Sequence, residues 1–298
     1  MKLEGIHHVT AITGDAPRNV AFYADTLGLR LVKKTVNQDD PTVYHLFYAD
    51  ERGSAGSDIT FFEYPGAQPG RPGAGMVHRV VWRVASAESL DFWAGRLGVA
   101  RDGDSLLFRD PEGLEHELVV DDSGEPPLVA EHPEIPREHA LRGFAGVRAY
   151  ARDAARSERF LSALGFEPGW VARGDERSGT YVYDASAEAV AIPGAGTVHH
   201  VAWASRMEDH EAWRERVSEA GGRPTPVIER FYFRSIYFRE PNGILFEIAT
   251  LGPGFTTDEP LEHLGERLSL PPAFEHLREQ VEPLLTPIRN PRESWTRA

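Results

Sequence analysis

The stretch Gly-Ile-His-His-Val-Thr at residues 5–10 recurs far along the chain as Thr-Val-His-His-Val-Ala at residues 197–202. Both stretches are short and apolar around a pair of histidines, which favours strands. A third strand-like segment closes on Phe246-Glu247. If folding brings these strands together, two imidazoles and one carboxylate would form the facial set of three ligands that leaves a divalent metal with open positions.

Bulk properties narrow the class of protein. The 298 residues suffice for two domains or four small repeated units, and 46 acidic against 32 basic residues give a net charge of −14. That charge argues against nucleic acid or an anionic membrane as a partner, since both need a basic surface. The absence of cysteine excludes disulfides and thiolate chemistry. Without a signal-peptide core or a membrane-length apolar run, we expect a cytoplasmic protein.

Internal repetition is the strongest indication of the fold. Four segments read as a strand, an amphipathic helix and a glycine that ends the helix. Their strands align at His8, His78, Gly146 and His200, and their stop glycines are Gly28, Gly98, Gly165 and Gly221. The separation between these two positions stays between 19 and 21 residues. Strand-like stretches follow each helix, so the unit is β-α-β-β-β, repeated four times.

The predicted fold is therefore α+β, with four βαβββ modules in two pairs and a C-terminal helical extension. We place the first two modules at residues 1–121, a proline-rich linker at 122–142, the other two modules at 143–250 and the extension at 251–298. Within the extension, an apolar spacing predicts a helix that docks on the body through Phe274, Leu277, Val281 and Leu284.

The chain resembles the vicinal oxygen chelate superfamily, which includes glyoxalase, bleomycin-resistance proteins and extradiol dioxygenases. It is most similar to the ring-cleaving branch that contains the hydroquinone dioxygenases. The resemblance covers nearly the whole chain and is carried by residues 5–15, 27–37, 44–50, 198–202, 230–247 and 251–259. It implies that the paired modules form two glyoxalase-like domains, whose sheets curve around a cleft with a metal inside.

The resemblance also implies a set of metal ligands shared by the first and fourth modules. His8 and His200 would come from the first strand of each module, and Glu247 from the last strand of the fourth. His7 and His199 should point to the opposite side of their strands, because side chains alternate along a strand. The resemblance makes them neighbours of the site, with His7 near the substrate and His199 near the chemistry.

Further residues are assigned by the same resemblance. Tyr237 would donate a hydrogen bond or a proton to a substrate oxygen, and Arg230 would stabilise anionic charge. Thr10 and Phe231 would lie near the substrate. All four are expected around the metal cleft of the first and fourth modules.

A second cleft is expected to be structural. Glu117 is the copy of Glu247 in the second module, but its potential partners are His78 and a strand without histidine at residues 146–148. We therefore expect side chains to fill that cleft. His45, His78 and His116 are interpreted as structural histidines.

These residues predict a non-haem Fe(II)-dependent extradiol-type dioxygenase that cleaves a hydroquinone or catechol with O2, with Mn(II) as the alternative metal. Two other functions stay open. With Glu63 as a fourth ligand, the site would suit a glyoxalase-like isomerase or lyase, and a resistance protein would bind a small molecule without catalysis. A homo-oligomer also stays open, although four modules already supply complete clefts.

Overall fold

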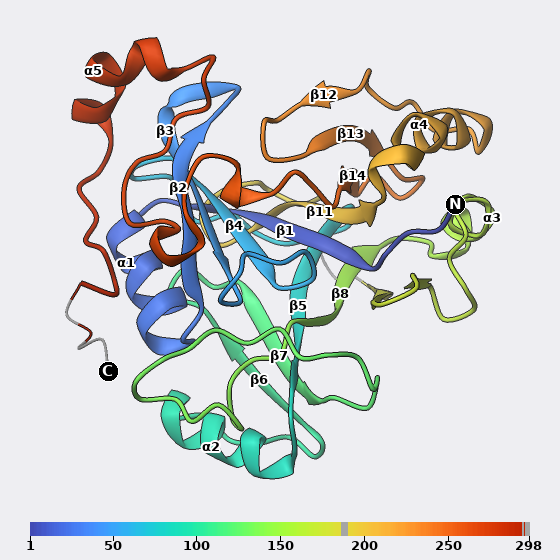
Figure 1. Cartoon of the computed structure of the whole chain (residues 1–298). Helices are drawn as coiled ribbons and strands as arrows, with labels where there is room; N and C mark the ends of the chain where they lie inside the picture. Colours follow the sequence, from blue (N-terminus) through green and yellow to red (C-terminus); the bar gives the residue numbers. More distant parts are fainter. Residues whose placement is uncertain (186–189, 294, 296–298) are drawn as a thin grey trace.

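The chain forms two curved β-sheets with short helices around them (Figure 1). The structure is a computed structural model and describes residues 1–185, 190–293 and 295. The strands are β1 Ile6–Thr13, β2 Arg30–Asn37, β3 Asp40–Ala49, β4 Asp58–Glu63, β5 Met76–Val84, β6 Ser105–Arg109, β7 Glu115–Val120, β8 Phe144–Ala151, β9 Val171–Arg173, β10 Ser178–Ala185, β11 Val198–Ser205, β12 Ile228–Glu229, β13 Arg234–Arg239 and β14 Leu245–Thr250.

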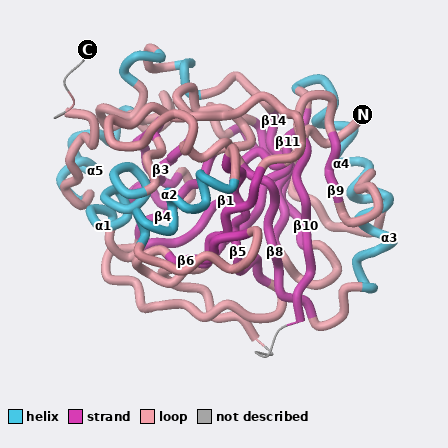
Figure 2. The backbone as a smooth tube through the Cα atoms, turned by 90° about the horizontal axis from the view of Figure 1, so that it is seen from below, coloured by secondary structure: helices cyan, strands magenta, loops and turns pink. Residues whose placement is uncertain are grey.

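The helices gather on two sides of the strands. Figure 2 shows α1 and α5 on one side and α3 and α4 on the other. The α-helices are α1 Ala16–Val20, α2 Ala87–Leu97, α3 Ala155–Ala163, α4 His210–Glu219 and α5 Arg278–Val281. A π-helical segment, Ala21–Thr26, continues α1. None of the described helices is long and apolar enough to cross a membrane.

Sheet topology shows which modules pair. The larger sheet has the order β12-β13-β14-β11-β1-β4-β3-β2, and the smaller has the order β6-β7-β5-β8-β10-β9. The first module thus joins the fourth and the second joins the third, through the antiparallel pairs β1–β11 and β5–β8. The predicted ranges 1–121 and 143–250 follow the order along the chain, whereas each sheet takes one module from each range.

The four modules are unequal in length. Among the described residues, the second and third modules contribute three strands each, against four from the first and fourth. Only seven residues separate α2 from β6, and seven separate α3 from β9. These connections are too short for a further strand, so the smaller sheet has six strands and the larger has eight.

Local contacts fix where the helices start, and a predicted glycine ends one of them. Asp15 accepts a hydrogen bond from the Arg18 amide at the start of α1, and Ser86 accepts one from Ser89 at the start of α2. Gly98 ends α2 with a φ of 65°, the left-handed conformation that favours glycine. The repeat therefore reflects real helix starts and stops.

The C-terminal extension differs from its prediction. It runs along the β2 edge of the larger sheet, shown in red in Figure 1, and Leu268 bridges to Lys34 of β2. Instead of one helix it forms 3-10 turns around the four-residue α5. Pro283 lacks the amide proton that would extend α5, so Glu282–Leu284 continues as a 3-10 turn and the apolar spacing shifts after Val281. Leu284 is 62% exposed and Leu285 is buried in its place.

Candidate metal centre

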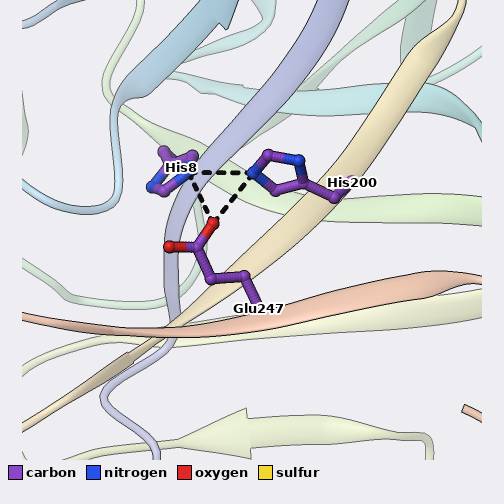
Figure 3. Close-up of side chains that lie close together, drawn as sticks. All are labelled: His8, His200 and Glu247. Atoms are coloured by element: carbon purple, nitrogen blue, oxygen red, sulfur yellow. Dashed lines mark hydrogen bonds and ion pairs between the residues drawn. The ribbon is translucent and has the colours of Figure 1, made fainter. Parts of the chain in front are cut away.

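Three side chains from three neighbouring strands converge inside the larger sheet (Figure 3). His8 lies on β1, His200 on β11 and Glu247 on β14, and all three are buried. Nε2 of His200 lies 2.9 Å from Oε2 of Glu247, Nε2 of His8 lies 3.2 Å from the same oxygen, and the two Nε2 atoms are 3.2 Å apart. Within the described residues, this is the only group of three such side chains close enough to hold a metal.

The geometry of this triad fits a divalent metal. Two ligands about 2.1 Å from one ion and at right angles to each other lie about 3.0 Å apart. Glu247 is fully buried, and burial alone would raise its pKa, but His8 and His200 hold that pKa well below its usual range. Among the described residues, no donor besides these imidazoles reaches the carboxylate. A buried carboxylate with two imidazole nitrogens suits iron, manganese or zinc.

His7 sets the proton position on His8. Nε2 of His7 lies 3.1 Å from the Thr250 carbonyl oxygen, which can only accept, so this nitrogen carries the proton. Burial and the neighbouring His8 lower the pKa of His7 to about 3, so the ring is neutral and its Nδ1 has a free lone pair. Nδ1 of His8, 2.9 Å away, must then donate. Nε2 of His8 then faces Glu247 and is the nitrogen that a metal would use.

His199 makes the same contact on β11. Its Nδ1 lies 2.8 Å from Nδ1 of His200, but unlike His7 its side chain is exposed. Each of these two rings thus lies against the ligand imidazole beside it, although neither lines the cleft around the triad. The β1–β11 ladder is irregular at both residues, and such bulges interrupt the alternation of side chains.

Two further predicted residues stand beside the triad. Tyr237 is opposite Glu247 in the β13–β14 ladder, and its ring centroid is 5.7 Å from that of His200. Burial and the charge of Glu247 raise the pKa of Tyr237, so its phenol is protonated at neutral pH. The Arg230 guanidinium lies 5.6 Å from the centre of that ring and donates to both oxygens of Asp39, at 3.0 and 2.9 Å.

These side chains line a cleft of about 430 Å³, its open mouth included. Thr10 and Phe231, predicted near the substrate, are not among the lining residues. Thr10 is fully buried beneath the wall. Phe231 has a φ of 68°, a left-handed turn that is rare outside glycine, and the two residues after it, Tyr232 and Phe233, line the cleft instead.

His45 also lines the cleft, although the sequence suggested only a structural role. It lies on β3, and its Nε2 is 2.9 Å from Oγ1 of Thr60 on β4. A single histidine in a strand gave no signal by itself. What places it at the site is the pairing of β3 with β4 and of β4 with β1.

The sheet register identifies equivalent positions in the modules. Two residues after each ligand histidine, the first strand pairs with the last strand of its module in parallel. Ala202 is opposite Glu247 in the fourth module, and Thr10 is opposite Thr60 in the first. Thr60 therefore occupies the position equivalent to Glu247, and a hydroxyl replaces the carboxylate there.

Glu63 is not a ligand of this centre. It lies three residues after Thr60 on β4 and so faces the other side of the sheet. Its Oε1 accepts a hydrogen bond from the Ala16 amide at the start of α1, 3.1 Å away. The alternative with Glu63 as a fourth ligand is therefore wrong for this structure.

The smaller sheet places other residues at the same positions. The β5–β8 ladder is irregular at His78, so Arg79 takes the position of a ligand histidine. The alignment of His78 with His8 was therefore one residue out. Glu117 is opposite Val81, two residues after Arg79, which makes it equivalent to Glu247. Nη1 of Arg79 donates to Oε2 of Glu117 at 3.0 Å.

Side chains fill only part of the second cleft, because a hollow of about 1100 Å³, its open mouth included, remains beside Glu117 and Thr180. Gly146 takes the other histidine position, and a Cβ there would lie 1.9 Å from Oγ1 of Thr180. His78 stacks on Tyr150 with 3.7 Å between ring centroids, and its Nε2 is 2.8 Å from Asp184. Nε2 of His78 therefore already has the Asp184 carboxylate as its partner.

Known proteins share this fold and sequence. Candidate ring-cleaving dioxygenase MhqA of Bacillus subtilis (strain 168) is 40% identical over 97% of this chain and 100% of its own. Chlorohydroquinone/hydroquinone 1,2-dioxygenase of Sphingobium indicum is 31% identical over 94% of this chain and 95% of its own. The crystal structure of a candidate dioxygenase from B. subtilis subsp. subtilis strain 168 has a TM-score of 0.89 and 38% identity, and covers 97% of this chain and 98% of that one.

The family model agrees with the modules seen in the structure. The model of the Glyoxalase/Bleomycin resistance protein/Dioxygenase superfamily matches residues 5–118 and 143–248, which are the two pairs of modules along the chain. The alignments with the relatives at 31 and 40% identity cover nearly the full length of this chain and of each relative. The chain belongs to the Glyoxalase/Bleomycin resistance protein/Dioxygenase superfamily and, within it, is a ring-cleaving dioxygenase.

Proposed function

We propose that this enzyme is a non-haem Fe(II)-dependent, extradiol-type dioxygenase that uses O2 to cleave the ring of a hydroquinone or a catechol, with Mn(II) as the alternative metal. The observation that carries the proposal is the buried triad of His8, His200 and Glu247, with 2.9 to 3.2 Å between its ligand atoms. The similarity to a chlorohydroquinone/hydroquinone 1,2-dioxygenase supports the class of substrate.

Fe(II) held by this triad would keep positions free for a substrate hydroxyl and O2, would lower the pKa of that hydroxyl, and would pass electrons to O2. The chain supplies the surroundings of that chemistry. Tyr237, protonated beside Glu247, donates a hydrogen bond to the substrate oxygen. The Arg230 guanidinium brings a positive charge to the cleft, and its two hydrogen bonds to Asp39 hold it in place. Phe62 and Phe233 exclude water from the walls.

His7 and His199 orient the ligand imidazoles. Each places its Nδ1 against the Nδ1 of the next histidine, so the Nε2 atoms of His8 and His200 face Glu247. Partners of this kind are worth about 10- to 100-fold in metal affinity or activity. We assign His7 and His199 this positioning role, and His199 in addition reaches the solvent.

An oxygen electrode and metal analysis test the proposal. The Fe(II)-loaded enzyme should take up one O2 per hydroquinone or catechol consumed and release a ring-opened product. His8→Ala, His200→Ala and Glu247→Ala should each lose bound iron and more than about 100-fold of the uptake, since loss of an outer partner alone costs up to about that much. Unchanged uptake in the three variants would refute the proposal.

The same assay separates the other two functions. An isomerase or lyase would convert its substrate without consuming O2, and a non-catalytic binding protein would bind the diol without any product. Because Glu63 caps α1 on the far side of the sheet, Glu63→Gln should keep both iron and O2 uptake. Loss of iron in that variant would support a four-ligand site instead.

A further inference from the structure

One further imidazole lines the cleft, on the wall that β3 of the first module supplies. His45 lies on β3, two strands away from β1 in the order β1-β4-β3, and lines the same cleft as the triad. Its ring is fixed between two aromatic neighbours, with centroids 4.0 Å from that of Phe47 and 4.4 Å from that of Phe62. The side chain is therefore held in one position at the cleft.

A hydrogen-bonded chain decides which nitrogen of His45 faces the cleft. Nε2 lies 2.9 Å from Oγ1 of Thr60, and that oxygen lies 2.8 Å from Oγ1 of Thr10. Both threonines are fully buried. Among the described residues, Nδ1 of His45 has no hydrogen-bond partner and is not one of the unpaired polar atoms sealed in the interior. Nδ1 is thus the free polar atom that His45 presents to the cleft.

The two walls of the cleft carry different chemistry at equivalent positions. Glu247 in the fourth module belongs to the triad, whereas its counterpart Thr60 in the first module holds His45. Tyr237 is opposite Glu247 in the same way that Phe47 is opposite Thr60. One wall can therefore bind the reacting end of a substrate, and the other offers a single hydrogen-bonding atom among aromatic rings.

The position of the second hydroxyl distinguishes the two classes of diol. When one hydroxyl lies at the triad, the second hydroxyl of a catechol lies beside it, whereas that of a hydroquinone lies at the opposite end of the ring. A hydroquinone thus carries a polar group to the far wall, and leaving that group unpaired in an aromatic pocket is costly. A hydrogen-bonding atom on the far wall removes that cost.

We propose that Nδ1 of His45 hydrogen-bonds the far hydroxyl of a hydroquinone and so selects 1,4-diols over catechols and simple phenols. The inference rests on the proposed function only in placing the first hydroxyl at the triad. With Nε2–H donating to Thr60, Nδ1 accepts the proton of the far hydroxyl. Burial, followed by the effects of His8 and His200, keeps the pKa of His45 well below its usual range, so this lone pair is available at neutral pH.

A binding cycle tests the role of His45 without turnover. The Fe(II)-loaded full-length enzyme and its His45→Phe variant are titrated calorimetrically with hydroquinone, catechol and phenol in the absence of O2. The wild type should bind hydroquinone about 10- to 100-fold more tightly than phenol, the range expected for a buried hydroxyl that gains a partner. His45→Phe, which keeps an aromatic ring, should bind the two about equally, with its affinity for catechol unchanged.

Thr60→Val provides an independent test that leaves His45 in the cleft. Loss of the Thr60 hydroxyl frees Nε2 and the ring orientation, so the preference for hydroquinone should fall about 2- to 10-fold. His45→Gln, which retains an acceptor, should keep part of the preference. Circular dichroism and thermal unfolding of each variant serve as controls for folding.

The outcomes separate this proposal from the dioxygenase proposal. Equal binding of hydroquinone and phenol by the wild type, or a full preference in both His45→Phe and Thr60→Val, would overturn the role of His45 even if O2 uptake is normal. Conversely, an enzyme that shows the preference but consumes no O2 with any diol would refute the dioxygenase proposal and leave the role of His45 standing.

Discussion

The two sheets of this chain carry different chemistry at equivalent positions. In the larger sheet, Glu247 faces His200 at 2.9 Å, and in the smaller sheet the equivalent Glu117 faces Arg79 at 3.0 Å. The guanidinium is a permanent cation of the chain, whereas a neutral imidazole leaves the carboxylate to be neutralised by a cation from solution. The residue that follows the bulge in the first strand is His8 in the larger sheet and Arg79 in the smaller one. This one residue therefore decides between a candidate metal centre and a structural ion pair.

The sharpest test of this comparison removes the same charge from each sheet. Glu247→Gln should abolish iron binding and reduce O2 uptake by more than about 100-fold, because an amide is a poor replacement for the one anionic ligand. Glu117→Gln should leave both quantities unchanged and lower the free energy of unfolding by about 1 kcal/mol through the weaker contact with Arg79. Metal analysis, the oxygen electrode and urea unfolding measure these effects. Iron loss in Glu117→Gln would contradict the comparison.

A second test asks whether the third module has room for a ligand side chain. Gly146→Ala should lower the free energy of unfolding by about 1–3 kcal/mol, because its Cβ would overlap Thr180. Gly95→Ala in α2 is the matched control, since nothing lies within 4 Å of its added Cβ. That change should raise stability by about 0.5–1 kcal/mol. Equal effects of the two variants in chemical denaturation would show that the third module has room for a Cβ at residue 146.

A third test concerns acid sensitivity in the smaller sheet. Burial lowers the pKa of His116 to about 3, and its ring nitrogens contact Trp82 and Tyr23. Between pH 6.5 and about 3 the unfolded chain binds a proton that the folded chain excludes, so stability falls as the pH falls. From pH 7 to 5.5 this histidine should account for about 1.3 kcal/mol of lost unfolding free energy.

The measurement is the difference in pH dependence between the wild type and His116→Gln, followed by urea unfolding at several pH values. Other groups titrate in both proteins and cancel in the difference. The variant should lose less stability than the wild type on acidification. Parallel curves would show that His116 is protonated in the folded protein.

Local sequence signals predicted the modules well. The predicted stop glycine Gly98 ends α2, because a helix stop depends on a few adjacent residues. The helix predicted in the extension was wrong after Val281, since Pro283 breaks the apolar spacing on which the prediction relied.

Predictions that depend on which residues pair between neighbouring strands were less accurate. The sequence suggested that His78 is equivalent to His8, but the bulge makes Arg79 the equivalent residue. His45 was interpreted as structural because its partner Thr60 is brought to it only by the pairing of β3 with β4. Neither a bulge nor a strand partner leaves a short-range pattern in the sequence.

The sequence by itself therefore determined the four repeated modules and proposed His8, His200 and Glu247 through the paired histidines and the final glutamate. Only the tertiary structure decided that bulges bring His7 and His199 against the ligand imidazoles, and that Arg79 pairs with Glu117 in the second cleft. The physical reason is the distance along the chain over which each interaction acts. Caps and periodicity act over a few residues, whereas β1 meets β11 across 192 residues of chain, from His8 to His200, in a register set by the packing of both sheets.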